Sequence, residues 1–178
     1  VEMNRLSPER QPLLLLALAD RRDAAVLPLV LKAAASGPKA LRVTALEVLV
    51  RLGNVSCVPV LLAAAADEDT ELAGTARQTL IHLPGADIDA DLLARLPQAT
   101  GKTRQVLIDL AGQRQIDGAL AAIRPGLQDR DAGIRGAAIQ AIGVMGDEKQ
   151  LADLVGLLQT SPSPRERADV EKALLAIS

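Results

Sequence analysis

Residues 135–147 read RGAAIQAIGVMGD, and residues 42–54, three times 31 positions earlier, read RVTALEVLVRLGN. Both segments begin with arginine, carry apolar residues at three- and four-residue intervals, and end in glycine followed by a short polar residue. Apolar residues at these intervals lie on one face of an α-helix. Each segment therefore predicts an amphipathic helix that stops at a Gly-Asn or Gly-Asp turn.

The whole chain repeats with this same period, because a shift of 31 along the sequence brings like residues into register. One column of the repeat is apolar throughout and contains Val30, Leu61, Leu92, Ile123 and Leu154. A second such column contains Ala34, Ala65, Leu96, Leu127 and Leu158. The last repeat needs one extra residue, near residues 161–164, to stay in register. These columns predict that every repeat buries the same positions against its neighbours.

Each repeat contains two amphipathic patterns, which predict a pair of antiparallel helices. We expect eleven helices in all: one near 7–19, four pairs between 23 and 145, and a last pair near 148–159 and 164–177. Ser7-Pro8 is typical of a helix start. The predicted breaks are Gly37-Pro38, Gly53-Asn54, Pro84-Gly85 and Gly146-Asp147. The prediction is an all-α fold, an α-solenoid that runs as one continuous array over residues 1–178.

The composition agrees with helix-on-helix packing. The 178 residues are 49% hydrophobic and 24% charged, with no Phe, Tyr or Trp and a formal net charge of -2. A weakly acidic chain without aromatic rings predicts no nucleic-acid binding, and its longest apolar run, Leu13–Ala19, is too short to span a membrane. Because the chain opens at Val1 rather than Met, we expect a piece of a longer protein, and its compartment stays open.

Two motifs of enzyme chemistry are incomplete. Residues 101–103, Gly-Lys-Thr, match the end of a phosphate-binding loop, but Leu96 stands where that motif needs glycine, so we predict only a helix start. Cys57 is the single thiol and His82 the single histidine. We predict a buried Cys57 and an exposed His82, and therefore no catalytic residues and no cofactor.

Three aspartates, Asp87, Asp89 and Asp91, have the spacing that begins a calcium loop. That loop requires glycine where this chain has Leu92, and a bidentate acid where it has Gln98. Acidic residues are also favourable at the start of a helix. We therefore predict that the aspartates stabilise a helix N-terminus and that the chain holds no metal.

Arginine recurs at one column, in Arg42, Arg104 and Arg135, while Asn54 and Asp147 occupy turns. A row of arginines is one way to bind an anion. In a repeat array, the same residues can instead bond to the turn of the next repeat and fix the register between repeats. We predict this structural ladder.

The segments 42–54 and 135–147, with Val58–Leu61 and Leu151–Leu154 after them, resemble the short bacterial form of the HEAT repeat. The resemblance covers nearly the whole chain and implies a superhelix of helix pairs, often found as part of a large multidomain protein. The repeat within residues 101–127 departs from the pattern, because Arg114 replaces an aliphatic residue and Ile116 an acid. The packing of that repeat stays open.

The second helices of the pairs share a polar stripe, whose members are Glu47, Arg51, Gln78, His82, Asp109, Gln113, Gln140 and Lys172. In arrays of this kind the second helices line the inner curve, so the stripe is expected to form a groove for a protein or peptide. The alternative is a solvated face without a partner.

We therefore predict a non-catalytic scaffold that binds a protein, a peptide or a neighbouring domain of its parent chain. Resemblance offers two alternatives, an accessory subunit of a HEAT-like bilin lyase and, less favoured, a HEAT-fold DNA glycosylase. Apolar runs at both ends, Leu13–Leu16 and Leu174–Ile177, lack polar caps and predict weak end-to-end self-association.

Overall fold

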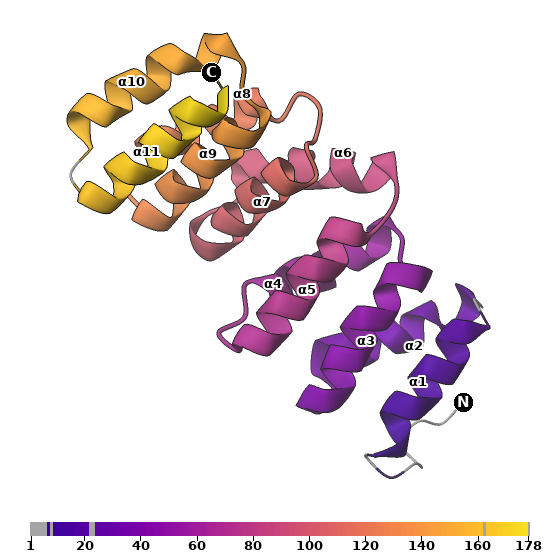
Figure 1. Ribbon diagram of the computed structural model, residues 1–178. Coiled ribbons are helices and arrows are strands. Elements are labelled where there is room, and N and C mark those ends of the chain that lie inside the picture. Colours follow the sequence, from indigo (N-terminus) through magenta and orange to yellow (C-terminus); the bar gives the residue numbers. More distant parts are fainter. Residues whose placement is uncertain (1–6, 8, 22–23, 162, 178) are drawn as a thin grey trace. The chain divides into compact units, whose positions relative to one another are not determined.

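The computed structural model describes residues 7, 9–21, 24–161 and 163–177, which form eleven α-helices and no strand (Figure 1). The number of helices and the all-α class confirm the sequence prediction. The chain divides into two compact units, Val1–Ile88 and Asp89–Ser178. Each unit is an α-solenoid of antiparallel helix pairs.

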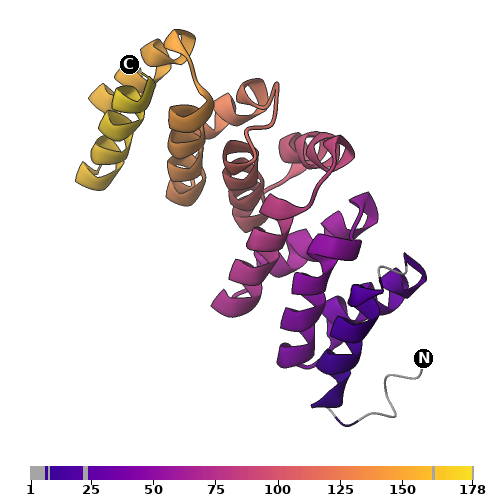
Figure 2. The same ribbon diagram turned by 45° about the vertical axis from the view of Figure 1, so that its right-hand side comes forward.

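The first unit contains two layers of helices. Its helices are α1 (Arg10–Asp20), α2 (Leu27–Ser36), α3 (Lys39–Leu52), α4 (Val58–Ala65) and α5 (Thr70–His82). The second helices of the pairs, α1, α3 and α5, pack side by side, and α2 and α4 lie behind them (Figure 2).

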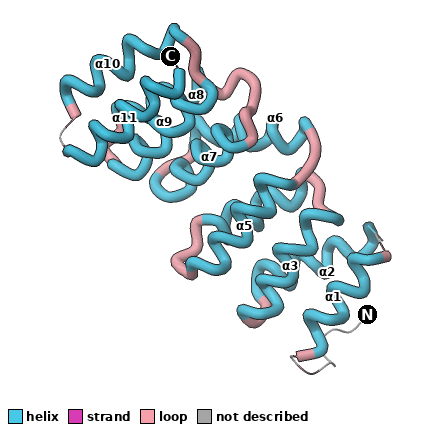
Figure 3. Tube along the Cα trace, in the orientation of Figure 1, coloured by secondary structure: helices cyan, strands magenta, loops and turns pink. Residues whose placement is uncertain are grey.

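The second unit repeats this arrangement. Its helices are α6 (Ala86–Arg95), which begins just before the unit boundary, α7 (Gly101–Gln113), α8 (Leu120–Ile123), α9 (Ala132–Met145), α10 (Leu151–Thr160) and α11 (Pro164–Ile177). The second helices α7, α9 and α11 form one layer, and α8 and α10 belong to the other (Figure 3).

The second helices keep the period of the sequence. They begin at Lys39, Thr70, Gly101 and Ala132, so each of these starts follows the previous one by the same step along the chain. Helix α11 begins at Pro164, one position later than that step would place it. The extra residue predicted near 161–164 is therefore confirmed.

The two predicted columns belong to the core, with one exception. Every member of the column from Val30 to Leu154 is at most 1% exposed. In the second column Ala34, Ala65, Leu96 and Leu127 are buried, but Leu158 is only half-buried. Helix α10 carries Leu158, and no described helix packs beyond α10, so this position has a neighbour on one side only.

Two predicted helix starts differ from the structure. Helix α1 begins at Arg10 rather than near Ser7, and its N-cap is Glu9, whose side chain makes no capping hydrogen bond. Ser7 contributes only its carbonyl, which accepts from the Arg10 N–H at 2.9 Å. Pro8 lies outside the described residues. The first turn predicted for the helix near 148–159 is instead a 3₁₀ turn, Glu148–Gln150, before α10.

All four predicted breaks lie between helices. Gly37, Gly53 and Gly146 are the C-cap residues of α2, α3 and α9. The fourth break contains Gly85, whose φ of 127° is in a region that other residues rarely adopt.

The repeat within residues 101–127 contains a short helix and a buried arginine. Helix α8 has only four residues and continues as a 3₁₀ helix, Arg124–Gln128, because Pro125 has no N–H to extend an α-helix. The Arg114 side chain is 8% exposed, and its Nε lies 2.6 Å from Oδ1 of Asp89. Ile116 is 4% exposed. The two residues that depart from the repeat pattern therefore both lie inside, with the arginine charge paired.

Candidate functional site

In the first unit, the polar stripe lies on α3 and α5. Glu47, Arg51, Gln78 and His82 are all exposed. The Arg51 Nη1 lies 2.7 Å from Oδ1 of Asp20 on α1, and Nδ1 of His82 is 2.8 Å from the Gln78 carbonyl oxygen. Arg51 therefore pairs across helices, while the charge of Glu47 and the amide of Gln78 face solvent.

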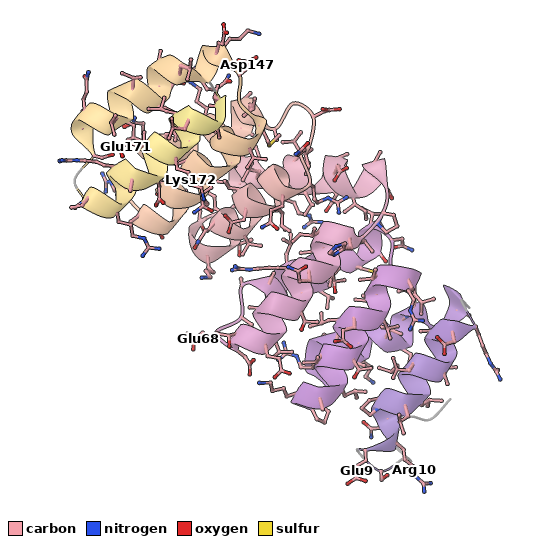
Figure 4. All side chains as sticks on the ribbon, in the orientation of Figure 1. Glu9, Arg10, Glu68, Asp147, Glu171 and Lys172 are labelled. Atoms are coloured by element: carbon pink, nitrogen blue, oxygen red, sulfur yellow. The ribbon has the colours of Figure 1, made fainter. Side chains whose placement is uncertain are left out.

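In the second unit, the stripe crosses three helices. Asp109 and Gln113 lie on α7, Gln140 on α9, and Lys172 on α11, where Figure 4 labels it. Gln113, Gln140 and Lys172 are exposed, and Asp109 is half-buried. The structure thus places the predicted residues on one face of each unit, and binding by them stays a prediction.

Two adjoining cavities open on this face of the second unit. The larger, of about 340 Å³, is mainly polar and lies among α7, α9 and α11. The smaller, of about 270 Å³, is mainly apolar and lies between α9 and α11. Gln140 and Asp169 line both cavities, so together they form one groove along α9, here called the α9 groove.

The lining of the α9 groove includes residues that sequence reasoning missed, among them Gln105, Val144, Arg165 and Asp169. Three of them stand one helical turn from a stripe residue: Gln105 precedes Asp109, Asp169 precedes Lys172, and Val144 follows Gln140. Residues three or four apart share a helix face, so this spacing was a signal. Arg165 does not stand three or four residues from any residue of the stripe.

Two glycines lie where the helices around the groove pack closely. A Cβ added at Gly112 would lie 2.9 Å from Cβ of Ala141, and one added at Gly143 would lie 3.0 Å from Cβ of Ala173. These two glycines let α7, α9 and α11 approach closely. A Cβ at Gly136, in the larger cavity, would meet nothing within 4 Å. A side chain at Gly136 would therefore meet no neighbour in the part of the chain that the structure describes.

A buried ion pair forms one wall of the larger cavity. Glu166 is 7% exposed, and its carboxylate accepts from Arg135 Nη2 at 2.7 Å and from Arg135 Nε at 3.2 Å. Arg135 Nη1 also donates to the Asp129 carbonyl at 3.0 Å. The hydrogen bond from Arg135 holds the pKa of Glu166 below its ordinary value. The pair joins α9 to α11 at a fixed register.

The other arginines of the predicted ladder also reach the next turn. Arg42 Nη2 lies 3.1 Å from Oδ2 of Asp67, and Arg104 Nη1 lies 3.2 Å from Oδ2 of Asp129. The aspartate follows its arginine at the same separation along the chain in both pairs. The structure thus shows pairs of the predicted kind in each unit, with Asp67, Asp129 and, on α11, Glu166 as the acceptors.

The acceptors differ from those that the sequence suggested. Asn54 and Asp147 do not bond to the arginines, because their side chains accept from Ser56 N–H and Lys149 N–H and so cap their own 3₁₀ turns. Short polar side chains in a turn reach a backbone N–H two residues on more easily than a neighbouring helix.

The positions of Cys57, His82 and residues 101–103 agree with the sequence predictions. Cys57 is fully buried, burial raises the pKa of its thiol, and His82 is exposed, as predicted. In residues 101–103 the glycine opens α7 with a φ of 53°, and Lys102 is exposed, so the predicted helix start is confirmed.

The three aspartates lie in the first two turns of α6. Asp89 pairs with Arg114, and both oxygens of Asp91 accept from Arg95, at 2.6 and 3.1 Å. In the described part of the chain, no cluster of three metal-binding side chains is found. Two of the aspartates are thus neutralised by arginines.

Apolar surface is exposed at α1 and α11. Leu13 and Leu16 are 64% and 38% exposed, whereas Leu15 is fully buried. Leu175 on α11 is 80% exposed. The run of leucines does leave apolar surface outward, as predicted. None of the helices within the described ranges has the length and hydropathy that crossing a membrane requires.

The chain is similar to a known repeat family and to solved structures. Residues 89–175 match the sequence model of a family described as HEAT repeats. Among solved structures, the chain is similar to one in "The structure of the complex of CpcE and CpcF of phycocyanin lyase from Nostoc sp. PCC7120". That match has 20% identity and a TM-score of 0.46, and it covers 93% of this chain and 75% of that chain. No curated protein matches the chain in sequence.

Proposed function

We propose that this chain is a non-catalytic scaffold that binds a protein or peptide partner on the face of its second helices, α3 and α5 in the first unit and α7, α9 and α11 in the second. The α9 groove is the observation that carries the proposal. It opens on the predicted stripe, and three separate helices supply its polar side chains. Arrays of helix pairs offer such extended surfaces to partners.

The layer of first helices in the second unit offers a less favourable binding surface than the face of the second helices. A depression of about 670 Å³ lies between the 3₁₀ helix Arg124–Gln128 and α10. Its principal charges are already paired, because Arg124 Nε lies 2.6 Å from Oδ2 of Asp153. A partner would have to break this pair to use either charge, whereas Gln140 and Lys172 face solvent.

The residues around the α9 groove favour binding over catalysis. Ser163 is the one hydroxyl or thiol side chain among its described lining residues, and no histidine lines it. A serine nucleophile needs an adjacent general base that is held in turn by a third group. The same lining carries three carboxylates and one arginine in the larger cavity, which does not favour a phosphate backbone or a glycosylase role.

Charge reversal on the stripe tests the proposal. Glu47→Lys and Lys172→Glu should each reduce capture of the native partner from source-cell lysate by about tenfold, measured by quantitative mass spectrometry. Thermal unfolding should stay nearly unchanged, because an exposed charge contributes about 0–1 kcal/mol to stability.

Matched controls reverse equally exposed charges off the stripe. Glu68→Lys, in the turn before α5 (Figure 4), and Lys149→Glu, in the turn before α10, should leave capture unaffected. Equal capture by stripe and control variants would contradict the proposal and place binding elsewhere.

An accessory role in bilin attachment stays the alternative that the sequence resemblance implies. It predicts that the isolated chain binds a tetrapyrrole, which would change the visible absorption spectrum of the pigment. An unchanged spectrum on titration with micromolar protein would exclude this role.

A further inference from the structure

We propose that Asp117 is a site of spontaneous isoaspartate formation, a modification that passes through a succinimide ring with Gly118. The site lies in the turn between α7 and α8, so it is independent of the binding face proposed above. Asp117 is the only aspartate that glycine follows, and neither asparagine of the chain precedes a glycine. The chain therefore has a single Asp-Gly sequence and no Asn-Gly sequence.

The reaction needs only these two residues and solvent water. The backbone nitrogen of Gly118 attacks the side-chain carboxyl carbon of Asp117, and the carboxyl OH leaves as water with the hydrogen of that nitrogen. Water then opens the ring at one of its two carbonyls. Opening at the side-chain carbonyl restores aspartate, whereas opening at the backbone carbonyl leaves a main chain that runs through Cβ. The water lost on ring closure returns on ring opening, so the product has the same mass.

The turn that carries this pair is open to solvent (Figure 3). Asp117 and Gly118 are both exposed, and they are the central residues of a turn in which the Ala119 N–H donates to the Ile116 carbonyl at 3.1 Å. Gly118 has a φ of 78°, which is typical of the third residue of a type II turn. A Cβ at Gly118 would meet nothing within 4 Å, so the turn has room to change its conformation.

Ring closure requires the turn to open locally. The second residue of a type II turn has a ψ of about 120°, which turns the Gly118 nitrogen away from Cβ of Asp117. Rotation about the Cα–C bond of Asp117 brings the nitrogen to the carboxyl carbon and breaks the hydrogen bond between Ala119 and Ile116. Exposed turns open in this way without unfolding of the whole unit. Because Gly118 has no Cβ, no side chain crowds the ring as it forms.

The product does not fit the packing around the turn. An isoaspartate adds one C–C bond, about 1.5 Å, to the main chain between Ile116 and Gly118. Ile116 is 4% exposed, and its N–H donates to the Ala111 carbonyl at 3.0 Å, while Ala119 is fully buried. Packing therefore fixes both ends of the turn, and the longer backbone displaces one of them. We expect the isomerised chain to unfold at a lower temperature than the unmodified chain.

Peptide mapping tests the proposal directly. The full chain is kept folded at neutral pH and physiological temperature for several weeks, then digested, with the chain before incubation as the blank. Electron-transfer fragmentation locates isoaspartate, because its extra main-chain carbon gives fragments that aspartate does not give. We expect several-fold more isoaspartate at Asp117 than at Asp87, which is also exposed but precedes Ile88.

Two variants check the chemistry. Asp117→Glu keeps the charge but needs a larger ring, so it should abolish the modification at this position. Asp117→Asn should form the same succinimide faster, with loss of ammonia, and the gain of a negative charge is measured by ion-exchange chromatography. Isoaspartate spread equally over the exposed aspartates would overturn the proposal. So would an unmodified Asp117 in the folded chain when the same chain in urea forms isoaspartate there, because the turn would then hold the pair apart.

Discussion

Replacing Glu166 by glutamine should destabilise the second unit by about 2–3 kcal/mol. The carboxylate is 7% exposed, accepts three hydrogen-bond contacts from Arg135 at 2.7–3.2 Å, and accepts one from Ser161 Oγ at 3.3 Å. Glutamine keeps the shape but loses the charge and one acceptor oxygen.

The magnitude follows from these contacts. A hydrogen bond to a charged group contributes about 1.5–3 kcal/mol, and breaking a buried ion pair costs about 3–5 kcal/mol when the remaining charge is left without partners. Arg135 retains the carbonyl oxygens of Asp129 and Arg130, at 3.0 and 3.2 Å, so the lower part of the range applies.

The effect should depend on pH in a defined direction. The pKa of Glu166 is lower in the folded chain than in the unfolded chain, because Arg135 donates hydrogen bonds to the carboxylate. The pair therefore stabilises fully above the ordinary glutamate pKa of about 4.3 and loses its contribution as pH falls through the folded pKa. The difference between the wild type and Glu166→Gln should shrink below about pH 4.

Urea unfolding followed by far-UV circular dichroism measures both effects, since the chain has no aromatic fluorophore. Glu171→Gln, an exposed position on the same helix, is the matched control and should stay within about 0.5 kcal/mol of the wild type. A loss below about 0.5 kcal/mol for Glu166→Gln, or one that is the same in acid as at neutral pH, would refute the reasoning.

Three further predictions concern packing and self-association. Leu92→Ala should cost about 2–5 kcal/mol in urea unfolding, because Leu92 is 1% exposed, and a cost below about 1 kcal/mol would mean that the core column is misassigned. Gly112→Ala should lower the thermal midpoint, because its Cβ would lie 2.9 Å from Cβ of Ala141. Gly136→Ala should stabilise the chain by up to about 1 kcal/mol, because its Cβ would meet nothing within 4 Å. A thermal midpoint raised by Gly112→Ala and lowered by Gly136→Ala would contradict the assigned helix contacts. Leu13→Lys, and Leu16→Lys more weakly, should reduce concentration-dependent self-association in light scattering, and a wild type that stays monomeric up to millimolar concentration would argue against any contact through α1.

The leucines of α1 differ in exposure along the run Leu13–Leu16. The sequence predicts self-association through the apolar run Leu13–Leu16 but does not specify which of its leucines face outward. The structure buries Leu15 completely and leaves Leu13 and Leu16 outward. The rotation of α1 about its axis depends on α3, against which it packs, and the sequence of α1 alone does not specify it.

The candidate face was predictable in part. The column that contains Glu47, Gln78 and Gln140 could be placed on one exposed side of the second helices, because helical spacing defines which residues share a face. The cavities beside Gln140 could not be predicted from the sequence. They depend on how closely α9 approaches α11 and on the direction of the Asp169 side chain.

The sequence by itself determined the number of helices, their four breaks, the one-residue insertion before α11 and the buried column from Val30 to Leu154. These features follow from spacing within one helix and from its strict recurrence from one repeat to the next, and both can be read along the chain without knowledge of its packing. Only the tertiary structure decided that Arg42 and Arg104 pair with Asp67 and Asp129 rather than with Asn54 and Asp147, and that Arg114 is buried against Asp89. Those contacts join different helices, so they depend on distances of a few ångströms that the packing of whole side chains sets.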